Sequence, residues 1–112
     1  MLITQTLLQE FLTETKADSA IIFGSTGDVI LAENIDFEDS VSAMSNAIIS
    51  MCNKFLSDLE KQELKQLIVK TADSTIVFTK INTEKTVAVF INAASNFGIF
   101  LHQVDALAKK LN

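Results

Sequence analysis

The sequence contains no arginine, no proline, no tryptophan or tyrosine, a single cysteine and only three glycines. A single cysteine excludes a disulfide within the chain, and one cysteine plus one histidine cannot supply the three or four such ligands that a zinc site uses. The absence of arginine removes the planar donor fork that binds phosphate or carboxylate at two points, and it excludes an arginine finger donated by this chain. Because neither proline nor a polar low-complexity stretch marks an internal boundary, we expect a single domain over residues 1–112.

The remaining composition is rich in apolar and acidic residues. Of the 112 residues, 48% are hydrophobic and 21% are charged, and the formal net charge is -5. A negative field of this kind repels phosphate backbones and anionic membranes. No apolar run is long enough to span a bilayer, and the first residues lack the basic flank of a signal peptide. We therefore expect a cytoplasmic protein that neither binds nucleic acid nor inserts into a membrane.

The spacing of apolar residues predicts three helices and five strands. Apolar side chains recur at helical intervals in three segments, and β-branched runs separated by short turns fill the rest. Helices are expected over residues 2–16, 36–61 and 96–111, and strands over residues 19–23, 29–32, 64–69, 75–81 and 86–91. The predicted order is therefore α-β-β-α-β-β-β-α.

Three of the predicted strands differ in how their apolar residues are placed. The segments 21–23 and 87–91 are apolar at every position, which is typical of strands covered on both faces. The segment 64–67, at the start of the strand predicted over residues 64–69, is more mixed and carries charge, as expected of an edge strand. These patterns predict an α+β fold, a three-layer sandwich in which a five-stranded, mostly antiparallel sheet has helices on both faces.

Candidate catalytic and metal-binding residues are few, and each has a plainer role. Asp36 and Asp39 are expected to cap the second helix, which accounts for the carboxylates of a possible acidic metal site with Glu38. Cys52 falls on an apolar helix face and His102 on a polar one, which predicts a buried thiol and a solvated imidazole rather than a nucleophile and its base. The Gly24–Gly27 segment leads into a strand and is expected to be a hairpin turn rather than a phosphate-binding loop. We therefore expect no catalytic residues, cofactor or metal.

The helix predicted over residues 36–61 has more apolar surface than one sheet can cover. Its apolar residues span an arc of about 200°, roughly twice what a surface helix needs. Either the first or third helix of the same chain packs on the excess, or a second copy does. For a dimer, the predicted contact residues are Met44, Ala47, Met51 and Phe55 of this helix with Leu64, Leu67 and Val69 of the following strand. The other edge of the arc, with Ile49, Cys52 and Leu56, stays open as the contact.

Small polar residues fill the rest of the same helix. In a dimer they are expected to form an outward platform on which another protein docks closely, with Lys54 and Asp58 at its margin. The predicted partner-binding residues are Ser42, Asn46, Ser50, Asn53 and Ser57. A third helix opens at Asn96-Phe97-Gly98, where either Ser95 or Asn96 is the predicted N-cap.

The order of these elements resembles the Roadblock family of dynein-associated light chains, which includes MglB-like proteins and Ragulator-type adaptors. The resemblance rests on the apolar hairpin of residues 21–32 turning through Gly27, on Ala43 and Ala47 in the second helix, and on Asn96-Phe97-Gly98. It implies a homodimer whose sheets join through the strand after the second helix, with the two second helices side by side. It further implies non-enzymatic work, the binding and regulation or scaffolding of a small Ras-like GTPase.

A second hypothesis belongs to a different class. Sensor-type domains with a similar sheet and flanking helices bind a small molecule between these layers, and such a site needs converging polar groups. The predicted strands carry almost only apolar side chains, which favours the interaction module over the sensor.

Overall fold

The computed structural model describes residues 2–92 and 96–112 and contains a single antiparallel sheet flanked by helices. Its elements are α1 (Leu2–Thr15), β1 (Ser19–Gly24), β2 (Val29–Glu33), α2 (Glu38–Asp58), β3 (Gln66–Lys70), β4 (Thr75–Lys80), β5 (Lys85–Ile91) and α3 (Phe97–Leu111). The strands lie in the order β2-β1-β5-β4-β3, and every neighbouring pair is antiparallel. The predicted fold class and element order are confirmed.

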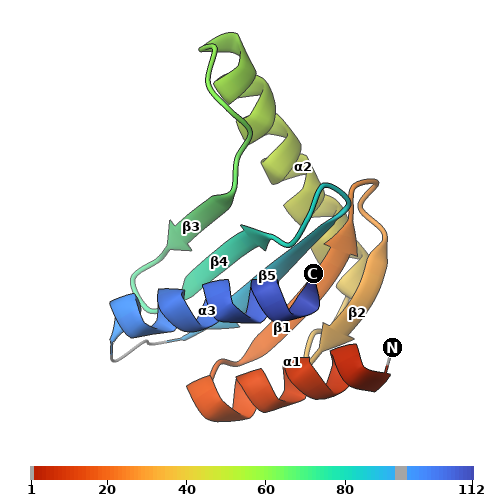
Figure 1. Ribbon diagram of the computed structural model, residues 1–112, viewed down its shortest axis with the longest axis vertical. Helices are drawn as coiled ribbons and strands as arrows, with labels where there is room; N and C mark the ends of the chain where they lie inside the picture. Colours follow the sequence, from red (N-terminus) through yellow and green to blue (C-terminus); the bar gives the residue numbers. More distant parts are fainter. Residues whose placement is uncertain (1, 93–95) are drawn as a thin grey trace.

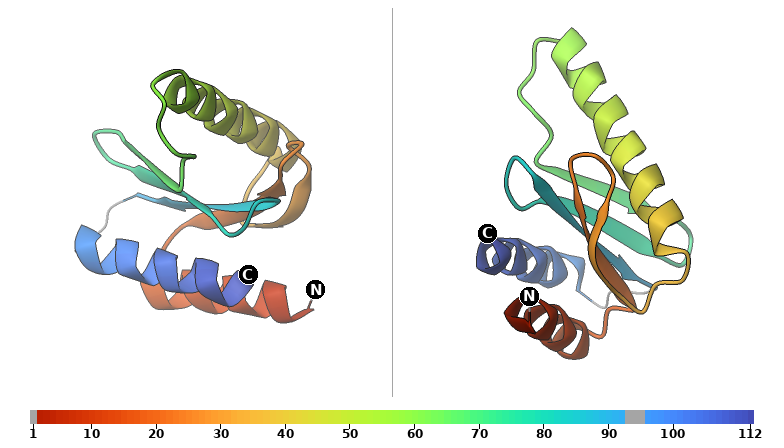
Figure 2. Two further views of the ribbon diagram at one scale, coloured as in Figure 1. Left: turned by 45° about the horizontal axis from the view of Figure 1, so that its top comes forward. Right: turned by 90° about the vertical axis from the view of Figure 1, so that its right-hand side faces the viewer.

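The three helices are shared unequally between the two faces of the sheet. Figure 2 shows α1 and α3 side by side on one face and α2 alone on the other. Among the described elements, α2 packs chiefly against β1 and β2, and its second half extends beyond the sheet (Figure 1). The alternative in which α1 or α3 covers the excess apolar arc of α2 is therefore wrong.

The larger core lies between the sheet and the α1–α3 layer. Alternate residues of the central strands point to this face, since successive side chains of a strand point to opposite sides. Its fully buried members include Leu8, Ala20, Val77, Val87, Val89 and Val104. The strands predicted to be covered on both faces are β1 and β5, which lie inside the sheet, whereas β3 lies at its edge as predicted.

The core on the α2 face is smaller and incomplete. Its buried apolar members among the described residues are Ile21, Phe23, Phe78 and Ala88. Several apolar neighbours on the same face stay half-buried, among them Leu67, Val69, Ile76 and Phe90 of β3, β4 and β5. One helix thus covers the β1–β2 side of this face and leaves the β3 side partly open.

Polar contacts fix the first half of α2 to the turn between β1 and β2. Ser42 is fully buried, and its hydroxyl donates to the carbonyl oxygen of Gly27. Gly27 has a φ of +86°, which favours glycine, and a side chain added there would lie 3.6 Å from Asn46. Asn46 donates to the carbonyl oxygen of Ser25 in the same turn, at 3.4 Å. The turn and α2 therefore hold each other in place.

The helix ends differ from the sequence prediction in one case and agree in the other. Asn96 caps α3, since its side chain accepts a hydrogen bond of 3.0 Å from the Ile99 N–H, while the alternative cap Ser95 lies outside the described residues. Asp36 was expected to cap the second helix, and this is wrong. The residue preceding α2 is Phe37, in a left-handed conformation with no side-chain cap. Glu38 and Asp39 instead follow in the first turn, where negative charge suits the helix dipole.

We expect Ser42→Ala to destabilise the protein by about 0.5–1.5 kcal/mol, because it removes the hydrogen bond from a buried hydroxyl to the half-buried carbonyl of Gly27. Ser50→Ala is the matched control on the exposed side of α2, with an expected change within about 0.5 kcal/mol. Urea unfolding followed by circular dichroism measures both values. Equal stabilities of the two variants would contradict the role of Ser42 in docking α2.

Candidate protein-interaction surface

A row of large apolar side chains on α2 is exposed to solvent. Met51 is 75% exposed, Phe55 64% and Met44 61%. Together with the exposed Ile48 and Leu59, these side chains recur at intervals of three or four residues, which places them on one side of the helix. We call the set the α2 stripe; its members are Met44, Ile48, Met51 and Phe55 of α2 and Leu59, the residue that follows the helix. A contiguous apolar surface of this kind on a small chain is typical of a protein-interaction site.

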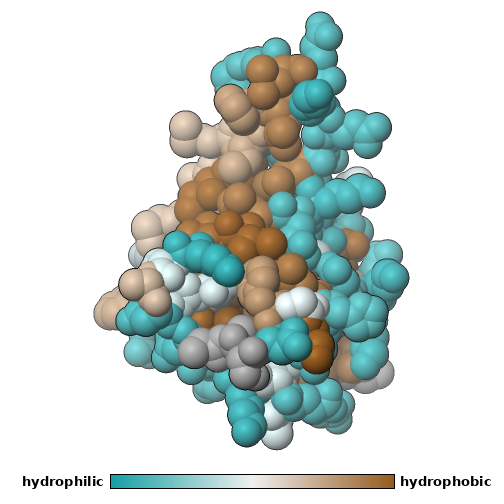
Figure 3. All heavy atoms as spheres, turned by 90° about the vertical axis from the view of Figure 1, so that its left-hand side faces the viewer, coloured by the Kyte–Doolittle hydropathy of each residue, from teal (hydrophilic) through white to brown (hydrophobic). Residues whose placement is uncertain are grey.

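The α2 stripe continues onto the sheet. Figure 3 views the molecule from the β3 side and shows hydrophobic side chains gathered along α2 and down toward the sheet. The half-buried residues Leu67 and Val69 of β3 lie on the same face of the sheet as α2. Helix and edge strand together therefore form one apolar surface.

The strand β3 presents a free edge beside this surface. It pairs with β4 on one side, and none of the described strands pairs with its other side (Figure 1). Unpaired backbone N–H and C=O groups make an edge strand a template for pairing with another strand. Of the predicted dimer-contact residues, Met44, Ala47, Met51 and Phe55 are exposed and Leu64, Leu67 and Val69 are half-buried.

The predicted polar platform is divided by the structure. Ser42 was expected to face outward, and this is wrong, because it is buried and bonded to Gly27. Asn46 and Asn53 are half-buried, and their side chains likewise form hydrogen bonds with backbone groups of the same chain. The side-chain oxygen of Asn53 accepts from the Leu64 N–H at 2.8 Å, which ties the segment after α2 back to the helix. Ser50 and Ser57 alone of the five are exposed, beside the Lys54–Asp58 ion pair of 3.5 Å.

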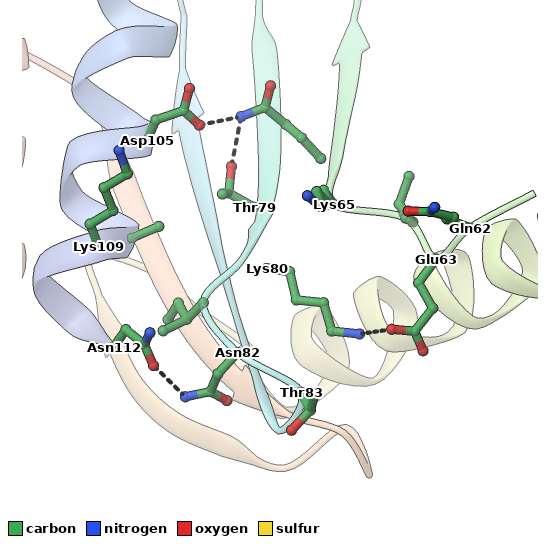
Figure 4. A pocket seen from close by; sticks show the side chains of 14 residues that line it. Gln62, Glu63, Lys65, Thr79, Lys80, Asn82, Thr83, Asp105, Lys109 and Asn112 are labelled. Carbon is green, nitrogen blue, oxygen red and sulfur yellow. Dashed lines mark hydrogen bonds and ion pairs between the residues drawn. The ribbon is translucent and has the colours of Figure 1, made fainter.

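A cavity of about 870 Å³ lies where β3, β4 and the end of α3 meet. Figure 4 shows its side chains bonded to one another across the opening. Gln66 donates to Asp105 at 2.9 Å and to Thr79 at 3.0 Å. The ammonium of Lys80 lies 3.3 Å from the Glu63 carboxylate. Several of its polar groups thus pair with each other rather than converge on the space.

The candidate reactive residues do not come together. Cys52 lies on α2 and His102 on α3, and these helices cover opposite faces of the sheet (Figure 2). His102 is exposed as predicted, whereas Cys52 is half-buried rather than buried, because α2 covers its face of the sheet incompletely. In residues 2–92 and 96–112, no group of three or more acidic, histidine or cysteine side chains is placed to hold a metal ion.

Sequence reasoning missed two exposed apolar residues. Phe37 is 85% exposed just before α2, and Ile68 is 39% exposed on β3. Ile68 could have been found from the two-residue period of the strand, since it alternates with Leu67 and Val69 and so lies on the other face. Phe37 was read as part of the helix, and the helical pattern carries no signal for its left-handed backbone. None of the helices described here has the length and apolarity to cross a bilayer.

Comparison with solved structures identifies the fold. The chain is similar to MglB of Myxococcus xanthus, with a TM-score of 0.89 and 12% identity over 96% of this chain and 90% of that one. An MglB with a tetrameric arrangement matches with a TM-score of 0.87 and 13% identity, over 96% of this chain and 84% of that one. A Roadblock/LC7 domain from Streptomyces avermitilis matches at 0.86, with 14% identity over 95% and 92%.

Comparisons of the sequence itself give no such match. Neither a protein-family model nor a curated protein matches the chain. The likeness is therefore one of architecture. The chain shares with these structures three helices around one antiparallel sheet, with the elements in the same order, over nearly the whole length of each compared chain. The chain has a Roadblock-type, MglB-like fold.

Proposed function

We propose that this chain forms a homodimer and, as a dimer, binds and regulates or scaffolds a small Ras-like GTPase. One observation carries the proposal: the α2 stripe is uncovered and lies beside the free edge of β3. A second copy related by a two-fold axis satisfies both at once, by pairing edge to edge while the helices pack together. The tetrameric arrangement of one similar MglB supports self-association within this fold.

The GTPase partner is inferred from the resemblance to the Roadblock family and from the MglB-like fold. We place the GTPase on the exposed polar side of α2, at Ser50, Ser57 and the Lys54–Asp58 pair. Small side chains allow close approach at little cost in side-chain entropy, and the charged pair sets orientation. Since the chain has no arginine, any stimulation of GTP hydrolysis acts through residues of the GTPase itself.

A second candidate function is small-ligand binding, which the cavity of about 870 Å³ favours. Its polar side chains already bond one another, as Gln66 does with Asp105, so a ligand has to displace those contacts. Chemical-shift mapping with a library of small polar compounds tests this candidate. Shifts confined to the surroundings of Gln66 and Lys109 would favour small-ligand binding over GTPase binding as the function.

Met51→Asp should convert the dimer to a monomer at about 10 μM, because the interface would bury a charge without a partner. Ser50→Asp carries the same charge on the other side of α2 and should leave the dimer intact. Light scattering after gel filtration gives the masses, and circular dichroism confirms that both variants are folded. A Met51→Asp dimer of unchanged affinity would contradict the α2 contact.

Ser50→Arg should weaken binding of the GTPase at least tenfold, about 1.4 kcal/mol, while leaving the dimer unchanged. The partner is first selected by pull-down with nucleotide-loaded small GTPases, and calorimetry then measures the affinity. His102→Arg is the control, since His102 is equally solvent-facing but lies on α3, on the opposite face of the sheet. Equal affinities for the two variants would place the GTPase elsewhere on the dimer.

A further inference from the structure

The free edge of β3 offers its hydrogen-bonding groups at alternate residues. The Lys80 N–H donates to the carbonyl of Lys65, and the Thr71 N–H donates to the carbonyl of Ser74. Because the backbone groups of an antiparallel strand point alternately to its two sides, the odd-numbered residues of β3 face β4. Gln66, Ile68 and Lys70 therefore turn their N–H and C=O groups outward.

The two faces of the sheet restrict how a second copy pairs with this edge. The two α2 stripes meet only if the two-fold axis is perpendicular to the sheet, which keeps both α2 helices on one face. Residues paired across antiparallel strands point to the same face. Such an axis must then pass through a residue and not between two, because Leu67 and Ile68 point to opposite faces.

Three positions of the axis, at Leu67, Ile68 or Val69, pair at least three of the five β3 residues with β3 of the second copy, and they differ in how many edge groups are satisfied. With the axis at Ile68, this residue pairs with its own copy and Gln66 pairs with Lys70 of the partner subunit, so all three outward residues are bonded. With the axis at Leu67, Lys70 faces Leu64, whose N–H is already taken by Asn53. With the axis at Val69, Gln66 faces a position beyond the end of β3. Unmade backbone hydrogen bonds are costly once the edge is covered.

Side chains favour the same position. An axis at Ile68 sets this exposed apolar residue against its copy. It also sets Lys70 of the partner subunit opposite Gln66, whose Nε2 already bonds Asp105 and whose Oε1 makes no hydrogen bond within the described residues. The ammonium group of Lys70, which within its own chain lies 4.3 Å from the centre of the Phe97 ring, thus gains an acceptor and a nearby carboxylate. The other two positions set Lys70 against Leu64 or Ile68.

We propose that two copies of this chain pair β3 to β3 about an axis through Ile68, so that Lys70 of each copy lies beside Gln66 and Asp105 of the other. The proposal rests on the dimer proposed above and adds its register. The free edge of β3 is then complementary to itself, and the partner that fits it is a second copy of this chain. Lys70 and Asp105 become the residues that select this partner, since a different chain need not carry both charges at matching positions.

Single cysteines introduced in a Cys52→Ser background test the register. In the proposed register Ile68 and its copy form a hydrogen-bonded pair. The Cα atoms of such a pair lie about 5.5 Å apart, which is within the range of a disulfide. Ile68→Cys should therefore link to its own copy under mild oxidation. Leu67→Cys and Val69→Cys should each fail to self-link, with Cα atoms about 8 Å apart, yet link to each other when mixed.

Each alternative result has its own meaning. Self-linking of Leu67→Cys or of Val69→Cys would move the axis to that residue and overturn the register while leaving the dimer standing. A dimer by light scattering in which none of the three variants links would remove β3 from the interface. A monomer by light scattering would overturn the register together with the proposed dimer.

Charge reversal gives a second, independent test. Lys70→Asp and Asp105→Lys should each weaken their own homodimer about tenfold, because each brings two pairs of like charges together. Mixing the two variants should restore the affinity, since the heterodimer contains two pairs of opposite charge. Sedimentation equilibrium measures all three affinities. A mixture that binds no better than the separate variants would show that Lys70 and Asp105 do not meet across the axis.

Discussion

Unequal coverage of the two sheet faces is the constraint on which the rest of this molecule depends. Two helices bury most of one face, whereas α2 alone has to cover the other. A helix about 10 Å wide spans roughly two strands, and α2 lies over β1 and β2. Apolar residues of β3, β4 and β5 therefore stay half-buried, and the helix side facing them stays exposed. The exposed apolar surface formed by the α2 stripe and β3 follows directly from this incomplete coverage of the sheet.

Apolar pattern alone determines much of this architecture. The continuous apolar runs of β1 and β5 place them inside the sheet, and the charged residues around β3 place it at the edge. These inferences succeed because burial of apolar surface dominates the choice of layer, and it is visible in the spacing of residue types. The excess apolar arc of the second helix was likewise visible, and it locates the candidate surface.

Polar residues are where sequence reasoning fails. A helical projection separates apolar from polar residues, but it does not reveal that a polar side chain forms a hydrogen bond with a backbone group of its own chain. Ser42 and Asn46 bond carbonyls of the β1–β2 turn, and Asn53 bonds the Leu64 N–H. The identity of those backbone groups depends on where the turn and the connecting segment lie in space. The left-handed Phe37, which replaces the expected Asp36 cap, depends in the same way on how the chain enters α2.

The same backbone bonds separate the two surfaces that the proposed function needs. Ser42, Asn46 and Asn53 anchor one side of α2, which leaves the α2 stripe on a second side and Ser50 with Ser57 on a third. A helix anchored on one side and apolar on the next can join a second copy and still present a polar side outward. Because the chain has no arginine, that side can orient a partner but cannot supply a planar cation to a transition state. In the proposed function, regulation by such a dimer works by holding residues of the GTPase in place.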